Sequence, residues 1–241
     1  MRLSARLEGL LELLSHSRAS LLIDVGCDHG YVSMEAVKRG LCERALACDI
    51  NKGPLLSAEK NIEAAGLKGS IRTVLSDGLK ALSAEDIKRP AVLLCAGMGG
   101  ALICSILTEG KDRLELIDRL ILSPQSEPEL VRSLLLNELS YDIVSETWIK
   151  DEGKYYVLID AERTAEKESC GSAPYSSSEL LFGRKGLLAK DKVLYEYLRL
   201  QLRSSEEALN RALRGSSDNA KKRQTELNEL IRDINIALEY Y

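Results

Sequence analysis

Short apolar runs alternate with helix-like segments along the first 160 residues, and this rhythm limits the possible folds more than any other feature. The runs expected to form strands cover residues 20–25, 45–49, 70–75, 91–95, 119–123, 142–149 and 155–161. Amphipathic helices are expected before and between them, with a leucine stripe from Leu3 to Leu14 and helices at residues 31–39 and 54–65. Repeated β-α units predict a parallel sheet with crossover helices, and the last two runs, joined across "KDEGK", predict a closing hairpin.

The remainder of the chain has a different pattern. Residues 163–178 are rich in Ser, Glu, Ala and Gly without a sustained period, which is typical of a linker. Two leucine and isoleucine stripes follow, separated by "RGSSDN", and they predict an antiparallel, coiled-coil-like helical hairpin. We therefore expect an α/β domain over residues 1–162, a linking segment over 163–183 and a helical hairpin over 184–241.

Composition excludes several classes of protein. With 45% hydrophobic residues the 241-residue chain can bury a substantial core, and it lacks the ~20 consecutive apolar residues that a membrane span requires. Six cysteines occur without a CxxC pair and only two histidines are present, so a reducing cytoplasmic location and no metal site are expected.

Charge is unevenly distributed along the chain. The formal net charge is −4, but residues 184–241 carry 12 Lys and Arg against 9 Asp and Glu, a net of +3. The first 183 residues then hold 21 basic and 28 acidic residues, a net of −7. A basic appendage on an acidic body is compatible with a polyanionic partner, although most of these charges are also expected on any solvated helix face.

The stretch "DVGCDHGYVS", residues 24–33, joins the first expected strand to the next helix. Its glycines are spaced G-x-x-x-G, whereas a dinucleotide-binding turn requires G-x-G-x-x-G, so a dehydrogenase is disfavoured. Asp24 and Asp28 would repel a diphosphate but attract a ligand that carries an ammonium and a sulfonium group. S-adenosylmethionine is such a ligand.

Polar residues also follow the later strands. Asp49 ends the second run and suits ribose hydroxyls, and Asp77 in "SDG" ends the third, where it could meet the adenine amine. The fourth run ends in "CAGMGG", whose glycines leave room for a flat substrate or else form only a sharp turn. Pro124 and Gln125 follow the fifth run and either line the site or turn the chain.

These motifs together resemble the bacterial tRNA (adenine-22-N1)-methyltransferases, the TrmK family. The similar segments are "LIDVGCDHGYVS", "ACDINKGPLLSAEKNI", "SDGL", "AGMGGALI", "ILSPQ" and "DEGKYYVLI", and the resemblance extends over nearly the whole chain. It implies a class I, Rossmann-like methyltransferase sheet, S-adenosylmethionine as cofactor, and methylation of adenine N1 in the D-arm of tRNA. The family pattern Q-P-N is replaced by Ser123, Pro124 and Gln125, and the position of Gly30 is often alanine in the family.

Site residues follow from these arguments. The residues predicted to bind the cofactor are Asp24, Gly26, Cys27, Gly30, Tyr31, Asp49, Ile50, Asn51, Asp77, Gly78, Ala96, Gly97 and Met98. The residues predicted to bind the RNA substrate are Gly99, Pro124, Gln125, Lys185, Arg199 and Arg203.

Two residues are predicted to be catalytic, Asp28 and its neighbour His29. Adenine N1 needs no deprotonation before it attacks a methyl group, but a carboxylate near N6 would accept the proton that the exocyclic amine then releases. Asp28 is the candidate for that carboxylate, and His29 is either catalytic or a hydrogen-bonded turn residue.

Other functions remain open at this point. A methyltransferase that acts on another RNA site or on a small molecule would keep the same glycine turn but need no basic appendage. A non-catalytic, cofactor-sensing interaction module would also keep the turn, although the glycine-rich "AGMGG" segment disfavours it. We expect a monomer that binds tRNA and no membrane.

Overall fold

The computed structural model describes residues 3–16, 18–164 and 174–241. The chain divides into two compact units, residues 1–170 and 171–241, which are described separately.

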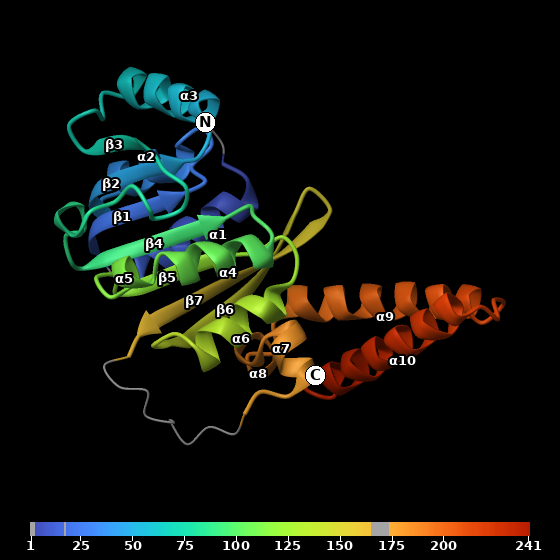
Figure 1. Ribbon diagram of the computed structural model, residues 1–241. Coiled ribbons are helices and arrows are strands. Elements are labelled where there is room, and N and C mark those ends of the chain that lie inside the picture. The colour runs from blue at the N-terminus through green and yellow to red at the C-terminus, as the bar shows by residue number, and fades with distance from the viewer. Residues whose placement is uncertain (1–2, 17, 165–173) are drawn as a thin grey trace. The chain divides into compact units, whose positions relative to one another are not determined.

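The first unit is built around one seven-stranded sheet (Figure 1). Its strands are β1 (Ala19–Val25), β2 (Cys42–Asp49), β3 (Ile71–Leu75), β4 (Ala91–Ala96), β5 (Arg119–Ser123), β6 (Tyr141–Asp151) and β7 (Lys154–Arg163). Their order across the sheet is β3-β2-β1-β4-β5-β7-β6. Neighbours among β1 to β5 are parallel, and β7 pairs antiparallel with both β5 and β6. The predicted sheet and its closing hairpin are confirmed.

Helices cover both faces of this sheet. The helices of the first unit are α1 (Ala5–Ser15), α2 (Tyr31–Lys38), α3 (Lys52–Ala64), α4 (Gly100–Glu109), α5 (Lys111–Leu114) and α6 (Pro128–Asn137), with a 3₁₀ turn at Ala84–Asp86. Figure 1 shows α4 and α6 in front of the strands and α1 behind them. Aliphatic side chains of α1, α2 and α3 form one buried cluster with the sheet. The central apolar runs thus become β1, β4 and β5, which are buried on both faces as parallel strands inside a sheet require, whereas β3 and β6 keep exposed residues.

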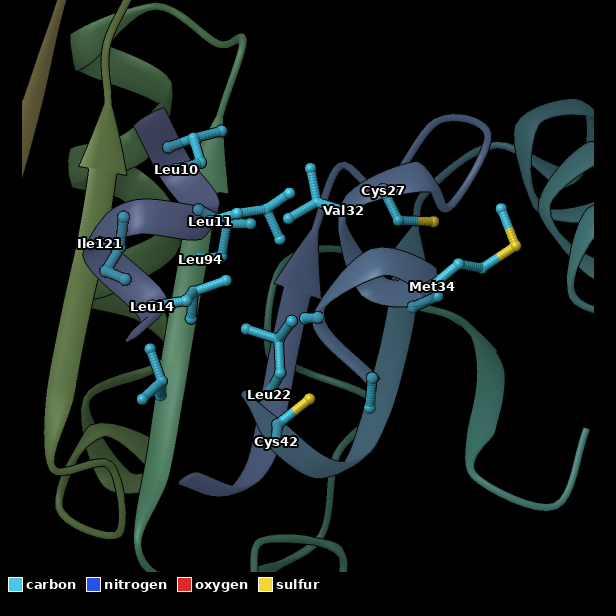
Figure 2. Packing of buried hydrophobic residues seen from close by; sticks show 14 of the residues in the cluster. Leu10, Leu11, Leu14, Leu22, Cys27, Val32, Met34, Cys42, Leu94 and Ile121 are labelled. Carbon is cyan, nitrogen blue, oxygen red and sulfur yellow. The ribbon is translucent and has the colours of Figure 1, made fainter. Parts of the chain in front are cut away.

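The position of α1 follows from its leucine stripe. Ser4 begins the helix, and its Oγ accepts a hydrogen bond from the backbone N–H of Leu7 (3.4 Å). Leu10, Leu11 and Leu14 then point toward the sheet, where Figure 2 shows them beside Leu94 and Ile121. This packing lays the first turn of α1 against the edge of the sheet at which the glycine turn lies.

Over its described residues, 174–241, the second unit contains four helices. They are α7 (Ser177–Phe182), α8 (Arg184–Leu188), α9 (Lys192–Ala212) and α10 (Asp218–Leu238). Helices α9 and α10, of 21 residues each, pack against one another as the predicted hairpin. Gln224 of α10 links them by donating hydrogen bonds to the carbonyl oxygens of Ala212 (2.9 Å) and Gly215 (3.3 Å).

Two details of this unit differ from the sequence expectation. The first stripe, from Leu187 to Leu213, is not one continuous helix, because Lys190 has a left-handed backbone (φ 52°) and Asp191 caps a new helix by accepting from Val193 N–H (2.8 Å). The expected linker, residues 163–183, contains helix α7, which begins with a reciprocal cap between Ser176 and Glu179. Part of that linker, residues 165–173, lies outside the described residues.

Candidate active site

The carboxyl ends of the parallel strands lie in register at one edge of the sheet. Val25 of β1 pairs with Cys48 of β2 and with Cys95 of β4, and Cys95 pairs in turn with Leu122 of β5. The residues that follow this row therefore stand side by side although they come from distant parts of the sequence. In parallel sheets of this order, ligands bind beyond these ends.

The glycine turn is tightly bound to the neighbouring strand. The backbone N–H groups of Gly26 and Cys27 both donate to the carbonyl oxygen of Cys48, at 2.9 and 3.0 Å. Gly26 has φ 77° and Gly30 has φ 72°, so both glycines adopt backbone conformations that side chains disfavour. A Cβ atom on Gly30 would also lie 3.3 Å from Cβ of Ala58 on α3, which explains the small residue there by packing.

Asp24 is the buried acid of the site. Its side chain accepts a hydrogen bond from Ser33 Oγ (2.7 Å), and the residue is only 5% exposed. Burial raises the pKa of this carboxyl to about 6, the Ser33 hydrogen bond lowers it, and the nearby Asp49 carboxylate raises it. The raised pKa means that burial makes the ionised carboxylate unfavourable, and a bound cation beside Asp24 would offset part of this effect.

Asp28 and His29 lie on the open side of the turn. Asp28 has a left-handed backbone (φ 51°) and a side chain that is 72% exposed. His29 Nδ1 is 2.8 Å from Ser57 Oγ, and its Nε2 lies 3.6 Å from Asp28 Oδ1. Asn61 donates to the carbonyl oxygen of His29 (3.0 Å). The imidazole is thus held between α3 and Asp28.

The loops after β4 and β5 are joined through their backbones. Gln125 N–H donates to the carbonyl oxygen of Met98 (2.8 Å), and Gly100 N–H donates to that of Ser126 (2.9 Å). A Cβ atom on Gly100 would come within 2.3 Å of the carbonyl oxygen of Glu127. The last glycine of "CAGMGG" is therefore required by packing between the two loops rather than by access to a substrate.

A cavity of about 370 Å³ opens beside the glycine turn. Its lining includes nine of the predicted site residues, namely Asp24, Gly26, Cys27, Asp28, His29, Tyr31, Ala96, Gly97 and Gln125. They come from the ends of β1, β4 and β5 and from the start of α2. The structure therefore brings together predicted residues that are up to 101 positions apart, from Asp24 to Gln125.

Two larger cavities, of about 540 and 550 Å³, lie at the opposite, amino ends of the strands. Their charged side chains are already paired in part: Arg89 donates to Asp118 (2.8 Å), and Arg72 is paired with Asp86. Because the glycine turn and the strand-end acids are absent from these linings, the smaller cavity is the candidate site.

Arg6 is a cavity residue that the sequence interpretation missed. It belongs to the first turn of α1, and its Nη2 atom lies 3.1 Å from the position that a Cβ atom on Gly97 would take. The sequence feature that could have identified it is its spacing. Arg6 follows Leu3 by three residues and precedes Leu10 by four, which places its charge at the border of the apolar stripe of the helix.

Other predicted cofactor residues lie outside the cavity lining. Asp49 Oδ1 accepts from the backbone N–H of Asn51 (2.8 Å), while Ile50 between them is 61% exposed. Asp77 is paired with Lys80 (2.6 Å). The remaining ones are Gly30, Gly78 and Met98. Met98 nevertheless covers the turn, since its Cε lies 3.1 Å from the Cβ position of Gly26.

The predicted RNA-binding residues fall into two groups. Gly99 and Pro124 belong to the loops beside the cavity, and the Cβ position of Gly99 is 3.0 Å from Ser126 Oγ. Lys185, Arg199 and Arg203 are exposed on α8 and α9 of the second unit.

Comparison with known proteins adds a decisive observation. The sequence model of the TrmK family, described as tRNA (adenine(22)-N(1))-methyltransferase, matches residues 22–236. The chain belongs to this family. A Bacillus subtilis (strain 168) protein named tRNA (adenine(22)-N(1))-methyltransferase is 33% identical over 192 residues, covering 80% of this chain and 77% of its own.

Solved structures of TrmK-like proteins agree over nearly the whole chain. A Streptococcus pneumoniae protein in complex with S-adenosyl-L-methionine is 31% identical, with a TM-score of 0.83 over 98% of this chain and 100% of its own. TrmK of M. capricolum in complex with S-adenosyl-homocysteine is 28% identical, with a TM-score of 0.83 over 100% and 99% of the two chains. The predicted Rossmann-like fold and TrmK membership are confirmed.

The site of this TrmK family member fits the cofactor of those relatives. A buried acid at the end of β1, a glycine turn and an acid at the end of β2 suit an ammonium group and ribose hydroxyls. Within residues 3–16, 18–164 and 174–241, no group of three His, Cys, Asp or Glu side chains is placed to hold a metal ion. None of the helices over these same ranges has the length and apolarity needed to cross a membrane.

Proposed function

We propose that this chain transfers a methyl group from S-adenosylmethionine to N1 of adenine 22 in tRNA. The observation that carries the proposal is the cavity at the carboxyl ends of the strands, which joins Asp24 and Gly26 of the glycine turn to Gly97 and Gln125 of the two following loops. In a member of the TrmK family, this arrangement supports a cofactor site beside the glycine turn and a base site at the two loops.

The cofactor, when bound, supplies a methyl group on a cationic sulfonium centre. Asp24 is assigned to the ammonium group of the cofactor, because burying an ionised carboxylate without a cation beside it costs free energy. Gly26 gives the cofactor close access to the backbone, and Asp49 is assigned to the ribose hydroxyls. These contacts align the methyl group with the incoming base, which is the main requirement of a displacement reaction.

Asp28 is assigned the proton transfer. Methylation at N1 makes the exocyclic amine of adenine acidic, and a carboxylate near N6 can accept its proton. Asp28 lines the cavity and is exposed, so a base that enters from solvent can reach it. His29, held by Ser57 on one side, faces Asp28 with its other nitrogen and orients it.

The base must leave its stack to react. N1 lies on the Watson–Crick edge, so adenine 22 has to be unpaired or turned outward before it can enter the cavity. Gln125, fixed through its backbone to Met98, presents an amide that can hydrogen-bond to the edge of the base. An amide thus remains where the family pattern has asparagine.

The second unit is assigned to the body of the tRNA. Its exposed Lys185, Arg199 and Arg203 can contact phosphates without reading sequence. Since the proposed substrate is tRNA, we place the enzyme in the cytoplasm. We also propose that the chain acts as a monomer.

The reaction is tested with two tRNA transcripts that differ only at position 22, adenine in one and guanine in the other. Nucleoside mass spectrometry should detect 1-methyladenosine in the first transcript alone. Asp28→Ala should lower the initial rate by about a hundredfold or more at saturating cofactor, whereas Asp112→Ala, at an exposed residue of α5, should leave it within about twofold.

Four results would contradict these assignments. Equal methylation of both transcripts would reject position 22, and methylation of a metabolite in place of tRNA would favour a small-molecule enzyme. Cofactor binding without turnover on any RNA would favour a sensing module. Near-normal turnover by Asp28→Ala would remove the proton-accepting role alone.

The role of the second unit is tested by Arg199→Gln combined with Arg203→Gln in the full chain. Affinity for tRNA should fall, and the slope of log affinity against log salt concentration should become shallower by about one for each phosphate that the variant no longer neutralises. Cofactor affinity should stay unchanged. An unaltered salt slope would show that these arginines do not bind the RNA.

A further inference from the structure

We propose that Arg6, on the first turn of α1, binds the carboxylate at the amino-acid end of the cofactor and so makes the site selective for a complete α-amino-acid group. This inference rests on the proposed function, because it assumes that S-adenosylmethionine occupies the cavity. It adds a ligand-binding residue from outside the motifs at the ends of the strands.

Arg6 is held in place from three sides. Its guanidinium carbon lies 4.9 Å from the ring centroid of Tyr156 on β7, which is a cation–π contact. Its backbone N–H donates to Asp151 Oδ2 on β6 (3.3 Å), and its Nη2 atom reaches the empty Cβ position of Gly97 (3.1 Å). The charge is therefore already positioned at the cavity before a ligand arrives, which reduces the entropy cost of binding.

The guanidinium has spare capacity for a ligand. Its Nε atom is buried and has no hydrogen-bond partner among the residues that the structure describes. Burial lowers the pKa of Arg6, and the negative charge of Asp151 only partly offsets this effect. An anion that enters the cavity would supply both the missing partner and the missing charge.

The charges of the cavity match a zwitterion. Asp24 and Arg6 both line it, but each interacts with a different residue. The Asp24 carboxylate accepts a hydrogen bond from Ser33, and the charge of Arg6 interacts with the carboxylate of Asp151. A negative and a positive group that engage different partners therefore face the same space. An α-amino-acid group, with an ammonium and a carboxylate on one carbon, complements both.

A phosphate of the RNA is the competing ligand for Arg6. It is disfavoured because Arg6 shares its cavity with the buried Asp24, whose negative charge would oppose a phosphate but not a zwitterion. Arg6 also contacts Gly97, next to the end of β4, rather than the exposed outer side of the turn where Asp28 lies.

The test compares two ligands that differ only in the carboxylate: S-adenosylhomocysteine and its decarboxylated analogue, S-adenosyl-3-thiopropylamine. Calorimetry should show that the unaltered protein binds the first about tenfold or more tightly than the second. Arg6→Gln should bind both with affinities within about threefold of each other, by losing affinity only for the first. Arg18→Gln, which removes an exposed arginine outside the cavity, should keep the full preference.

Each alternative result has a distinct meaning. If Arg6→Gln keeps the tenfold preference, or weakens both ligands equally, the carboxylate assignment is wrong. A loss of tRNA affinity with an unchanged preference would assign Arg6 to a phosphate instead. If the folded, unaltered protein binds neither ligand, the proposed function fails as well. Should Arg6→Gln not fold, Arg6→Lys keeps the charge without the planar fork and should lose about threefold for S-adenosylhomocysteine alone.

Discussion

Asp24 links stability to cofactor binding, and replacing it with asparagine should separate the two. The carboxyl has a pKa of about 6 in the folded chain, against an ordinary value of 3.8. At 1.36 kcal/mol per pKa unit this difference corresponds to about 3 kcal/mol. The folded chain thus binds the Asp24 proton more tightly than the unfolded chain does, so this contribution to stability is complete below pH 3.8 and is lost as the pH rises through about 6.

Asp24→Asn should therefore gain stability relative to the unaltered protein as the pH increases. The difference in the free energy of unfolding between the two proteins should grow by about 2 kcal/mol between about pH 4.5 and 7, which is the larger part of the total of about 3 kcal/mol, and then level off. Urea unfolding at several pH values across this range measures it, and the difference cancels the titration of groups that the two proteins share.

Binding should change in the opposite direction. The ammonium of the cofactor requires an ionised partner, so Asp24→Asn should bind S-adenosylhomocysteine about tenfold or more weakly at about pH 7.5. Asp28→Asn is the matched control: its side chain is 72% exposed, and its free energy of unfolding should change by less than about 0.5 kcal/mol. A stability difference between Asp24→Asn and the unaltered protein that stays flat across the pH range would refute the reasoning.

Packing and burial lead to three further predictions. Gly100→Ala places a Cβ atom 2.3 Å from the carbonyl oxygen of Glu127 and should destabilise the fold by about 2 kcal/mol, whereas Gly69→Ala, with open space around it, should not, as thermal unfolding would show. Glu146→Gln removes the charge that balances the fully buried Arg132 and should cost about 3–5 kcal/mol in urea unfolding. Iodoacetamide at about pH 8 should alkylate three thiols only after unfolding, by peptide mass spectrometry, because burial raises the pKa of Cys27, Cys48 and Cys95.

Local sequence patterns were sufficient to predict most of the sheet. The fifth strand was predicted at residues 119–123 and is observed as Arg119–Ser123, and the first was predicted at 20–25 and is observed as Ala19–Val25. Mostly apolar runs with at most one charged residue identify strands that are buried on both faces, where a charged residue such as Arg119 needs a buried partner, here Asp160. The long helices were less certain, and the break at Lys190 and Asp191 was missed because leucines recur on both sides of it.

The candidate site was only partly accessible to the same reasoning. Residues that follow strands could be assigned to one edge of the sheet, which is why Asp24, Ala96 and Gln125 were proposed together and now line one cavity. Whether each side chain is available to a ligand depended on neighbours that the motifs do not include. Asp77 is engaged by Lys80, and Gly100 serves the contact with Glu127.

The sequence by itself determined the order of the elements, the glycine turn and the residue types at the end of each strand, because these depend on interactions between residues close along the chain. Tertiary structure alone decided that Arg6 reaches the cavity and that Asp24 becomes hard to ionise. The position and the ionisation of a charged group depend on what surrounds it in space. For Arg6 those surroundings are Gly97 and Tyr156, which lie about 90 and 150 residues away along the chain.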